Sequence, residues 1–325
     1  HITIAANPGD VVIIDDEGNT PEWEGAFQAE GKAFFDIYDI EIRHGGFYGF
    51  FIFSEAHHFT IEGCRTDDTN SSGIYVYGAY GDYCHDFVIR NNHIVYPNQG
   101  TNAVYGSRLF ASQEAISLHT AHDFVVEGNE VQQGNKEGID AKGQSYNGII
   151  RNNYIHDFPD KTQDRLDRGD DLYPGIPGIY MDGSSNMEVY GNFIRRTIYG
   201  IAVSSEAAVD IENISIHDND MAQGPHRGPD QSPDMSHGIL MSWIDAYGYA
   251  NKSGITVEDN DVEATIMFFC GEHPEYVHSL HITNNRLFGG NSALVDFRYG
   301  EPTDDYVENG NAEASGSLPA NPNWP

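Results

Sequence analysis

Five residues with acidic, basic or phenolic side chains occupy matching points of a short repeated motif between residues 137 and 206. Lys142 and Asp182 each end a five-residue Gly-Ile motif. Asp140 and Tyr180 lie two residues before them, and Glu206 follows the next copy. If the copies stack on consecutive turns about 4.8 Å apart, the carboxyl groups of Asp182 and Glu206 would lie about 5–9 Å apart, the range that glycoside hydrolases use. We therefore predict that these five residues form a catalytic site.

The two carboxyl groups would need different protonation states. We predict that the one beside Lys142 stays ionised as nucleophile or base, and that the other keeps its proton and serves as the acid. A hydrolase of this kind requires no cofactor. The alternative interpretation is that Asp182 and Lys142 form a surface ion pair of little consequence.

A second group of acidic residues surrounds Lys142 in the same motifs and comprises Glu114, Glu137 and Asp140. Oxygen-rich clusters on neighbouring turns can hold Ca²⁺. These three residues are therefore candidate calcium ligands. The alternative is a solvated acidic face, which the acidic composition also favours.

Aromatic and histidine side chains lie at outward positions of the other Gly-Ile motifs and near them. Large aromatic side chains on an outward face are costly without a partner, which favours sugar stacking. The histidines also fit hydrogen-bonding roles that support loops. We predict that five of these residues bind substrate: Tyr75, Tyr77, His119, His237 and Trp243.

Two alternating patterns must position these side chains. One is the Gly-Ile motif, and the other is hydrophobic-x-(Gly/Asn/Asp)-Asn; both have the period-2 alternation of short strands. Short intervals between copies of the second pattern are 24 to 28 residues, as expected for a solenoid with one turn per repeat. Its asparagines should stack in one column at a bend: Asn92, Asn129, Asn153, Asn192, Asn219, Asn260 and Asn285, with Cys64 at the equivalent point of an eighth copy.

From residue 1 to about 298 the chain resembles the right-handed parallel β-helix superfamily, which includes pectate lyases, polygalacturonases, alginate lyases and epimerases, and glycoside hydrolases. The resemblance implies an all-β, single-stranded solenoid of roughly 9–10 coils that binds carbohydrate. Gly-Ile-Tyr-x-Asp with an acid one coil later is similar to β-helical glycosidases of the xylosidase type. Tyr180-Met-Asp182 is followed by Gly-Ser-Ser, which departs from the Tyr-x-Asp-Pro-His-Asp motif of alginate epimerases.

Two alternatives to hydrolysis follow. In β-helical lyases a basic residue removes the proton next to a uronate carboxylate that Ca²⁺ neutralises, so Lys142 would be the base of a calcium-dependent lyase. The other alternative is a non-catalytic, structural or adhesive solenoid that associates end to end through open strand edges. Otherwise the expected state is a monomer whose partner is a polysaccharide or oligosaccharide.

Insertions interrupt the repeat at related points. The segments 96–113, 158–177 and 222–237 each follow an Asn strand and precede a Gly-Ile strand, so they should form one wall beside the Gly-Ile face. The segment 244–253 should emerge elsewhere. We expect a β-helix over residues 1–299 and a tail over residues 300–325 that packs on the solenoid or is partly disordered.

Composition limits the partners. The formal net charge is -33, which disfavours nucleic acid and anionic membranes, and no apolar run approaches a membrane span. The three cysteines are too few for a disulfide framework, and Cys64 and Cys84 are out of phase in the repeat, so no disulfide should join them. The chain starts at His1, and we expect the mature part of an exported, extracellular or periplasmic protein.

Overall fold

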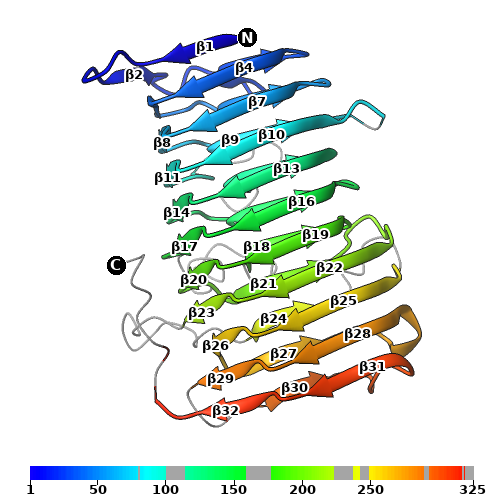
Figure 1. Ribbon diagram of the computed structural model, residues 1–325. Helices are drawn as coiled ribbons and strands as arrows, with labels where there is room; N and C mark the ends of the chain where they lie inside the picture. Colours follow the sequence, from blue (N-terminus) through cyan, green and yellow to red (C-terminus); the bar gives the residue numbers. More distant parts are fainter. Residues whose placement is uncertain are drawn as a thin grey trace, which may run out of the picture.

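A computed structural model describes residues 1–79, 81–99, 114–158, 177–222, 237–241, 249–288, 293–316 and 318. Among them, three parallel sheets wind around one axis, with the chain passing through sheets A, B and C in turn in each coil (Figure 1). The only helical element among these residues is a 3₁₀ turn, η2 (Pro274–Tyr276). The right-handed parallel β-helix predicted from the repeats is therefore confirmed, and its sheets have 10 or 11 strands.

The strands of each sheet follow one another in coil order. Sheet A contains β1 (Ile2–Ala5), β4 (Ala33–Tyr38), β7 (His57–Glu62), β10 (Cys84–Arg90), β13 (Ala121–Glu127), β16 (Tyr146–Arg151), β19 (Ser185–Tyr190), β22 (Ile211–His217), β25 (Lys252–Glu258), β28 (Val277–Thr283) and β31 (Asp304–Asn309). Sheet B contains β2 (Val12–Asp15), β5 (Ile40–Arg43), β8 (Arg65–Asp67), β11 (His93–Val95), β14 (Glu130–Gln132), β17 (Tyr154–His156), β20 (Phe193–Arg195), β23 (Asp220–Ala222), β26 (Asp261–Glu263), β29 (Arg286–Phe288) and β32 (Ala312–Ala314). Sheet C contains β3 (Gly25–Glu30), β6 (Tyr48–Phe53), β9 (Ile74–Tyr77), β12 (Ile116–His119), β15 (Ile139–Lys142), β18 (Pro177–Asp182), β21 (Tyr199–Ser204), β24 (His237–Met241), β27 (Ile266–Cys270) and β30 (Ala293–Phe297).

The interior consists of aliphatic and aromatic side chains stacked one coil above another. Ile61, Ile89 and Val126 occupy the same position on β7, β10 and β13 and are fully buried. Each lies between half-buried neighbours, because alternate residues of a strand point to opposite faces. A column of this kind stabilises the solenoid by removing apolar surface from water at every coil.

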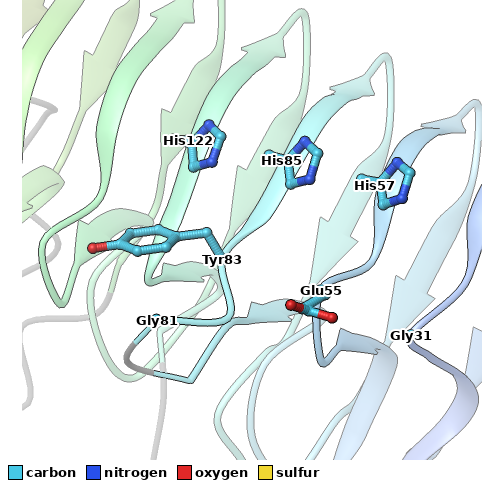
Figure 2. A pocket seen from close by; sticks show the side chains of 7 residues that line it. All are labelled: Gly31, Glu55, His57, Gly81, Tyr83, His85 and His122. Carbon is cyan, nitrogen blue, oxygen red and sulfur yellow. The ribbon is translucent and has the colours of Figure 1, made fainter.

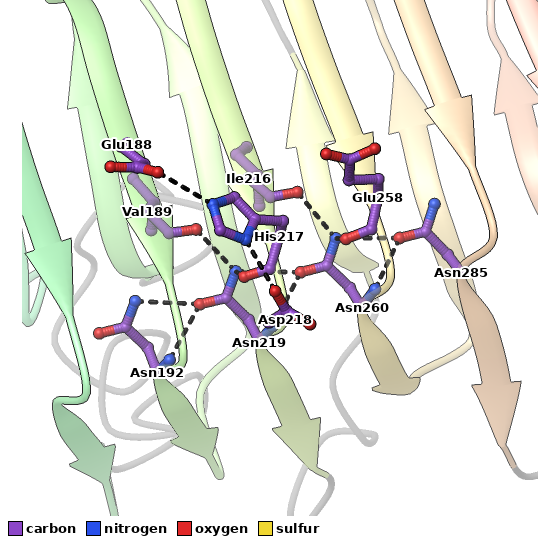
Figure 3. Close-up of polar contacts among 10 residues, drawn as sticks. All are labelled: Glu188, Val189, Asn192, Ile216, His217, Asp218, Asn219, Glu258, Asn260 and Asn285. Carbon is purple, nitrogen blue, oxygen red and sulfur yellow. Dashed lines mark hydrogen bonds and ion pairs between the residues drawn. The ribbon is translucent and has the colours of Figure 1, made fainter.

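The asparagine column lies at the bend between sheets A and B, as predicted (Figure 3). The side-chain oxygen of Asn219 accepts from both the backbone and the side-chain nitrogen of Asn192, at 3.0 and 2.9 Å. Equivalent bonds run from Asn92 through Asn285 and on to Asn311. At Cys64 the backbone nitrogen still donates to Asn92. The left-handed backbone of the bend belongs to the Gly, Asn or Asp that precedes the column residue, such as Asp218 at φ 52°.

The glycine of the Gly-Ile motif lies where coils approach each other closely at the corner between sheets B and C. A Cβ atom added at Gly138 would lie 2.5 Å from the carbonyl oxygen of Gly178, and one added at Gly200 would lie 2.5 Å from the carbonyl oxygen of Gly238. Real Cβ atoms do not approach a carbonyl this closely, so a side chain here would push two coils apart. The motif therefore sets the start of each sheet C strand, and with it the position of the residues that follow.

The insertions leave the solenoid at the predicted corners. Those at 96–113, 158–177 and 222–237 each connect a strand of sheet B to one of sheet C, whereas 244–253 lies between β24 of sheet C and β25 of sheet A. Most of their residues lie outside the described ranges. The boundary at residue 299 was set too early, because β31 and β32 pair with β28 and β29 and form a further coil that reaches Ala314.

The predictions that the cysteines form no disulfide and that no segment spans a membrane can be compared with the structure of the solenoid. Cys64, Cys84 and Cys270 are free and buried. Within the described part of the chain, no helix is both long and apolar enough to cross a membrane.

Candidate functional site

The predicted catalytic residues meet on the outer face of sheet C, where β15 and β18 run side by side. Lys142 pairs in register with Asp182, and Asp140 pairs with Tyr180. The one-coil offset read from the Gly-Ile motifs is therefore confirmed. Asp140 and Tyr180 are buried, whereas Lys142 and Asp182 at the strand ends are half-buried.

Glu114 is the centre of the ionic contacts at this site. Its side chain is 3% exposed, and its carboxylate accepts from Lys142 Nζ at 2.5 Å, Lys136 Nζ at 3.2 Å and Ser117 Oγ at 2.8 Å. Burial opposes the charge on Glu114, but the two ammonium groups outweigh it and hold the pKa of this carboxyl well below its usual range. Glu114 is therefore an ionised anchor for both lysines.

Lys142 is held in its charged form by the same contacts. Burial favours the neutral amine, but the neighbouring Glu114 carboxylate raises the pKa of Lys142 above its ordinary value. Its Nζ lies 3.7 Å from Asp140 Oδ2. A general base must be free of its proton near the working pH, so this environment argues against Lys142 as a base.

Asp140 and Glu137 are two further acidic residues of the same cluster. Asp140 Oδ1 and Glu137 Oε2 have no hydrogen-bond partner among the described residues. Burial, followed by the charge of Glu114, raises the pKa of Asp140 well above its ordinary value, and burial also raises the pKa of Glu137. Both carboxyl groups therefore favour the protonated state.

Asp182 differs from our expectation that Lys142 would keep it ionised. The Lys142 ammonium contacts Glu114 and Asp140 instead. Burial raises the pKa of Asp182 to about 7, and the negative charge of Glu206 contributes to this rise. The backbone N–H of Glu206 donates to Asp182 Oδ1 at 2.7 Å, which lowers the pKa and opposes the rise. Asp182 is therefore a carboxyl group that can hold a proton near neutral pH.

Tyr180 and Ser204 complete the surroundings of Asp182. Burial and the charges of Asp182 and Glu206 raise the pKa of Tyr180 well above its ordinary value, so its phenol stays protonated. Ser204 pairs in register with Asp182 on the next coil and is buried, with its hydroxyl beside that of Tyr180. These hydroxyls supply neutral hydrogen-bonding groups next to the carboxyl pair.

Tyr75, one of the residues predicted to stack on a sugar, is covered by its neighbours. This side chain is 3% exposed and packs with Tyr48 and Phe51 in a cluster on the outer face of sheet C. It cannot stack on a sugar without displacing these neighbours, because its faces are already covered. Tyr77 is half-buried and contacts the His119 ring, with 5.1 Å between centroids.

The two histidines lie in different places. His119 is one coil from Lys142 in the same column, and burial and the Lys142 charge lower its pKa. His237 lies beyond β21 and contacts Tyr199 and Phe269. It aligns with Tyr199 at the opposite strand end, so it is not gathered with Asp182. Trp243 lies outside the described residues.

The candidate calcium ligands form part of the buried cluster, but their arrangement differs from an oxygen cage. Glu114, Glu137 and Asp140, all within the described ranges, do not bring three ligand oxygens within 4.8 Å of one another. Both oxygens of Glu114 are bonded to lysines. A calcium site here would require the lysines to move away, and it stays a prediction. Lys136 and Ser117 were not predicted to belong to the site, although Lys136 directly precedes Glu137 in the sequence.

Solved structures with the same architecture have diverse functions. The A-module of the Azotobacter vinelandii mannuronan C-5 epimerase AlgE4 is 16% identical with a TM-score of 0.56, over 85% of this chain and 64% of that one. The hyperthermoactive exopolygalacturonase of Thermotoga maritima is 10% identical with a TM-score of 0.57, over 89% and 72%. PfbA, a surface adhesin of Streptococcus pneumoniae, is 12% identical with a TM-score of 0.57, over 95% and 76%.

At these identities the likeness concerns the fold alone, and the chain spans less than two thirds of the epimerase module. No curated protein sequence matches significantly. Residues 27–159 match the model of the periplasmic copper-binding protein NosD. The right-handed β-helix model matches residues 98–303, more than half of the chain. Together with the three parallel sheets, this match shows that the chain belongs to the right-handed β-helix family.

Proposed function

We propose that this protein is a glycoside hydrolase that cleaves a polysaccharide or oligosaccharide on the outer face of sheet C. The observation that carries the proposal is the pair Asp182 and Glu206. Burial raises the pKa of Asp182 to about 7, and Glu206 is close enough for its negative charge to add to this rise. A protonated carboxyl beside an ionised one is the pairing that glycoside hydrolysis requires.

In this mechanism Asp182 is the acid and Glu206 is the base or nucleophile, the reverse of the roles we expected from the sequence. Asp182 would protonate the glycosidic oxygen as the bond to the anomeric carbon breaks. Glu206 would then activate a water molecule or attack the anomeric carbon itself. The Glu206 backbone N–H orients Asp182 through its bond to Oδ1. The Tyr180 phenol would stay neutral and Glu114 and Lys142 would stay an ion pair, so the charges around the two catalytic carboxyl groups would not change during the reaction.

The lyase alternative depends on Lys142 as a base, and the contacts of Lys142 with Glu114 and Asp140 disfavour it. Polysaccharide-active enzymes of this fold, such as the exopolygalacturonase, support a carbohydrate substrate. A periplasmic or extracellular location fits such a substrate, and the NosD proteins are described as periplasmic. PfbA, which has a similar fold, is described as a surface adhesin, so binding without turnover is the competing outcome.

The test is release of reducing ends from a panel of neutral and uronate-containing polysaccharides. We expect Asp182→Asn and Glu206→Gln each to lower turnover by at least about 100-fold, with melting temperatures close to the wild type at pH 5. Glu212→Gln, which changes an exposed carboxylate on β22, is the matched control and should retain activity. Full activity of both site variants would overturn the proposal. An unsaturated, ultraviolet-absorbing product would favour a lyase.

A further inference from the structure

A row of histidines crosses the outer face of sheet A, away from the site on sheet C (Figure 2). His57, His85 and His122 occupy one register position on β7, β10 and β13. Their rings are stacked, with centroids 4.7 and 4.9 Å apart and planes inclined by 3° in both pairs. The solenoid repeat therefore presents imidazoles one coil apart on a solvent-facing surface.

His58 adds another imidazole to one end of this row. Its backbone is left-handed, at φ 54°, and its Nδ1 lies 2.8 Å from the Nδ1 of His57. Two ring nitrogens at this distance must share a proton, because two lone pairs would repel each other. Among the described residues, His57, His58 and His85 are the one group whose possible metal-ligand atoms all lie within 4.8 Å of one another.

A carboxylate lies beside this group. Asp86 Oδ2 is 2.8 Å from His85 Nδ1 and 3.7 Å from His58 Nδ1. Its negative charge offsets that of a bound cation, and a carboxylate hydrogen-bonded to a histidine commonly orients the ring for metal binding. The row also borders a pocket of about 420 Å³ that Glu55 and Tyr83 help to line, so an ion could enter from solvent.

We propose that His57, His58 and His85 bind a divalent transition-metal ion, with Asp86 as the charge-balancing fourth group. Imidazole nitrogen favours ions such as Zn²⁺ over Ca²⁺ or Mg²⁺, which prefer oxygen. Two nitrogens bonded to one tetrahedral Zn²⁺ lie about 3.3 Å apart. His57 and His58 would therefore separate by about half an ångström as the ion replaces their shared proton.

The electrostatic setting supports binding. Burial and the neighbouring imidazoles of His85 and His58 lower the pKa of His57, which favours the neutral form that binds metal. A bound ion would join the consecutive coils of β7 and β10. This site is independent of the proposed hydrolase, since its residues lie on a different sheet from Asp182.

The experiment measures Zn²⁺ binding by calorimetry at pH 7.5 on the intact chain after removal of metal with a chelator. We expect one site that excess Ca²⁺ or Mg²⁺ does not compete for, and a rise in melting temperature with Zn²⁺. His58→Gln and His85→Gln should each weaken this site at least about tenfold, because each removes one ligand. Asp86→Asn should weaken it less. Bound Co²⁺ should give the intense visible absorption of four-coordinate cobalt.

The matched control is His122→Gln, which changes the next ring of the same row but lies outside the three-residue group. It should bind Zn²⁺ as the wild type does. Zinc-free melting temperatures establish that each variant is folded. The proposal is overturned if the wild type binds no Zn²⁺ at micromolar concentrations, or if His58→Gln and His85→Gln bind as tightly as His122→Gln. Neither result depends on hydrolase activity.

Discussion

Replacing Asp182 with Asn tests the electrostatics of the candidate site without knowledge of the substrate. The side chain keeps its shape, and its amide oxygen can still accept from the Glu206 backbone N–H, which lies 2.7 Å from Oδ1 in the wild type. What disappears is the ionisation of a half-buried carboxyl whose pKa rises from 3.8 to about 7 on folding. The variant should therefore differ from the wild type in how its stability depends on pH.

The sign follows from proton binding. Between about pH 4 and 7 the folded wild type holds a proton on Asp182 that the unfolded chain has released, so this group destabilises the folded state progressively as the pH rises through that window. A shift of roughly three pH units corresponds to about 4 kcal/mol as an upper limit. The Asn variant lacks this loss, so its stability relative to the wild type should increase by roughly 2–4 kcal/mol between pH 4 and 8.

The assay is the melting temperature of both proteins at intervals from pH 4 to 8.5, with Glu212→Gln as the control for a general loss of negative charge. We expect the difference between Asp182→Asn and the wild type to grow by roughly 3–8 °C toward high pH. In a Glu206→Gln background this difference in melting temperature should grow at lower pH, because loss of the neighbouring negative charge lowers the pKa of Asp182. A difference that stays constant across the range would refute the desolvation of Asp182 and with it the acid assigned in the mechanism.

Two further predictions concern the scaffold and the buried ions. Gly138→Ala should lower the free energy of unfolding by about 2 kcal/mol or more, measured by chemical denaturation, because its Cβ would lie 2.5 Å from the Gly178 carbonyl oxygen. Gly81→Ala is the comparison, because no atom lies within 4 Å of the added Cβ and its cost comes from the φ of 92° alone. Lys142→Ala should cost about 3–5 kcal/mol by leaving the Glu114 carboxylate with an incomplete set of partners, and adding Glu114→Gln should recover part of that loss. A double variant no more stable than Lys142→Ala would contradict the ion-pair interpretation.

The repeat pattern alone was sufficient for the coil order and for the pairing of Lys142 with Asp182. Strand alternation and the Gly-Ile and Asn motifs are local features, and once copies stack, their register follows from counting residues. The bend column from Asn92 to Asn285 was predictable for the same reason. Where the pattern weakens, after residue 299, the last coil was missed, although Asn311 continues the column.

Only the tertiary structure decided which side chains are buried and which charges pair. The alternation of a strand predicts that its outward positions are exposed, yet Tyr75 and Asp140 are buried on the outer face of sheet C. Lys142 turns to Glu114, which lies outside any strand, rather than to its register partner Asp182. The histidine group on sheet A combines a stacked column with the left-handed His58. Burial and charge pairing depend on distances between segments far apart in the chain, and a repeat that specifies backbone register does not specify how long side chains and corner residues turn toward one another.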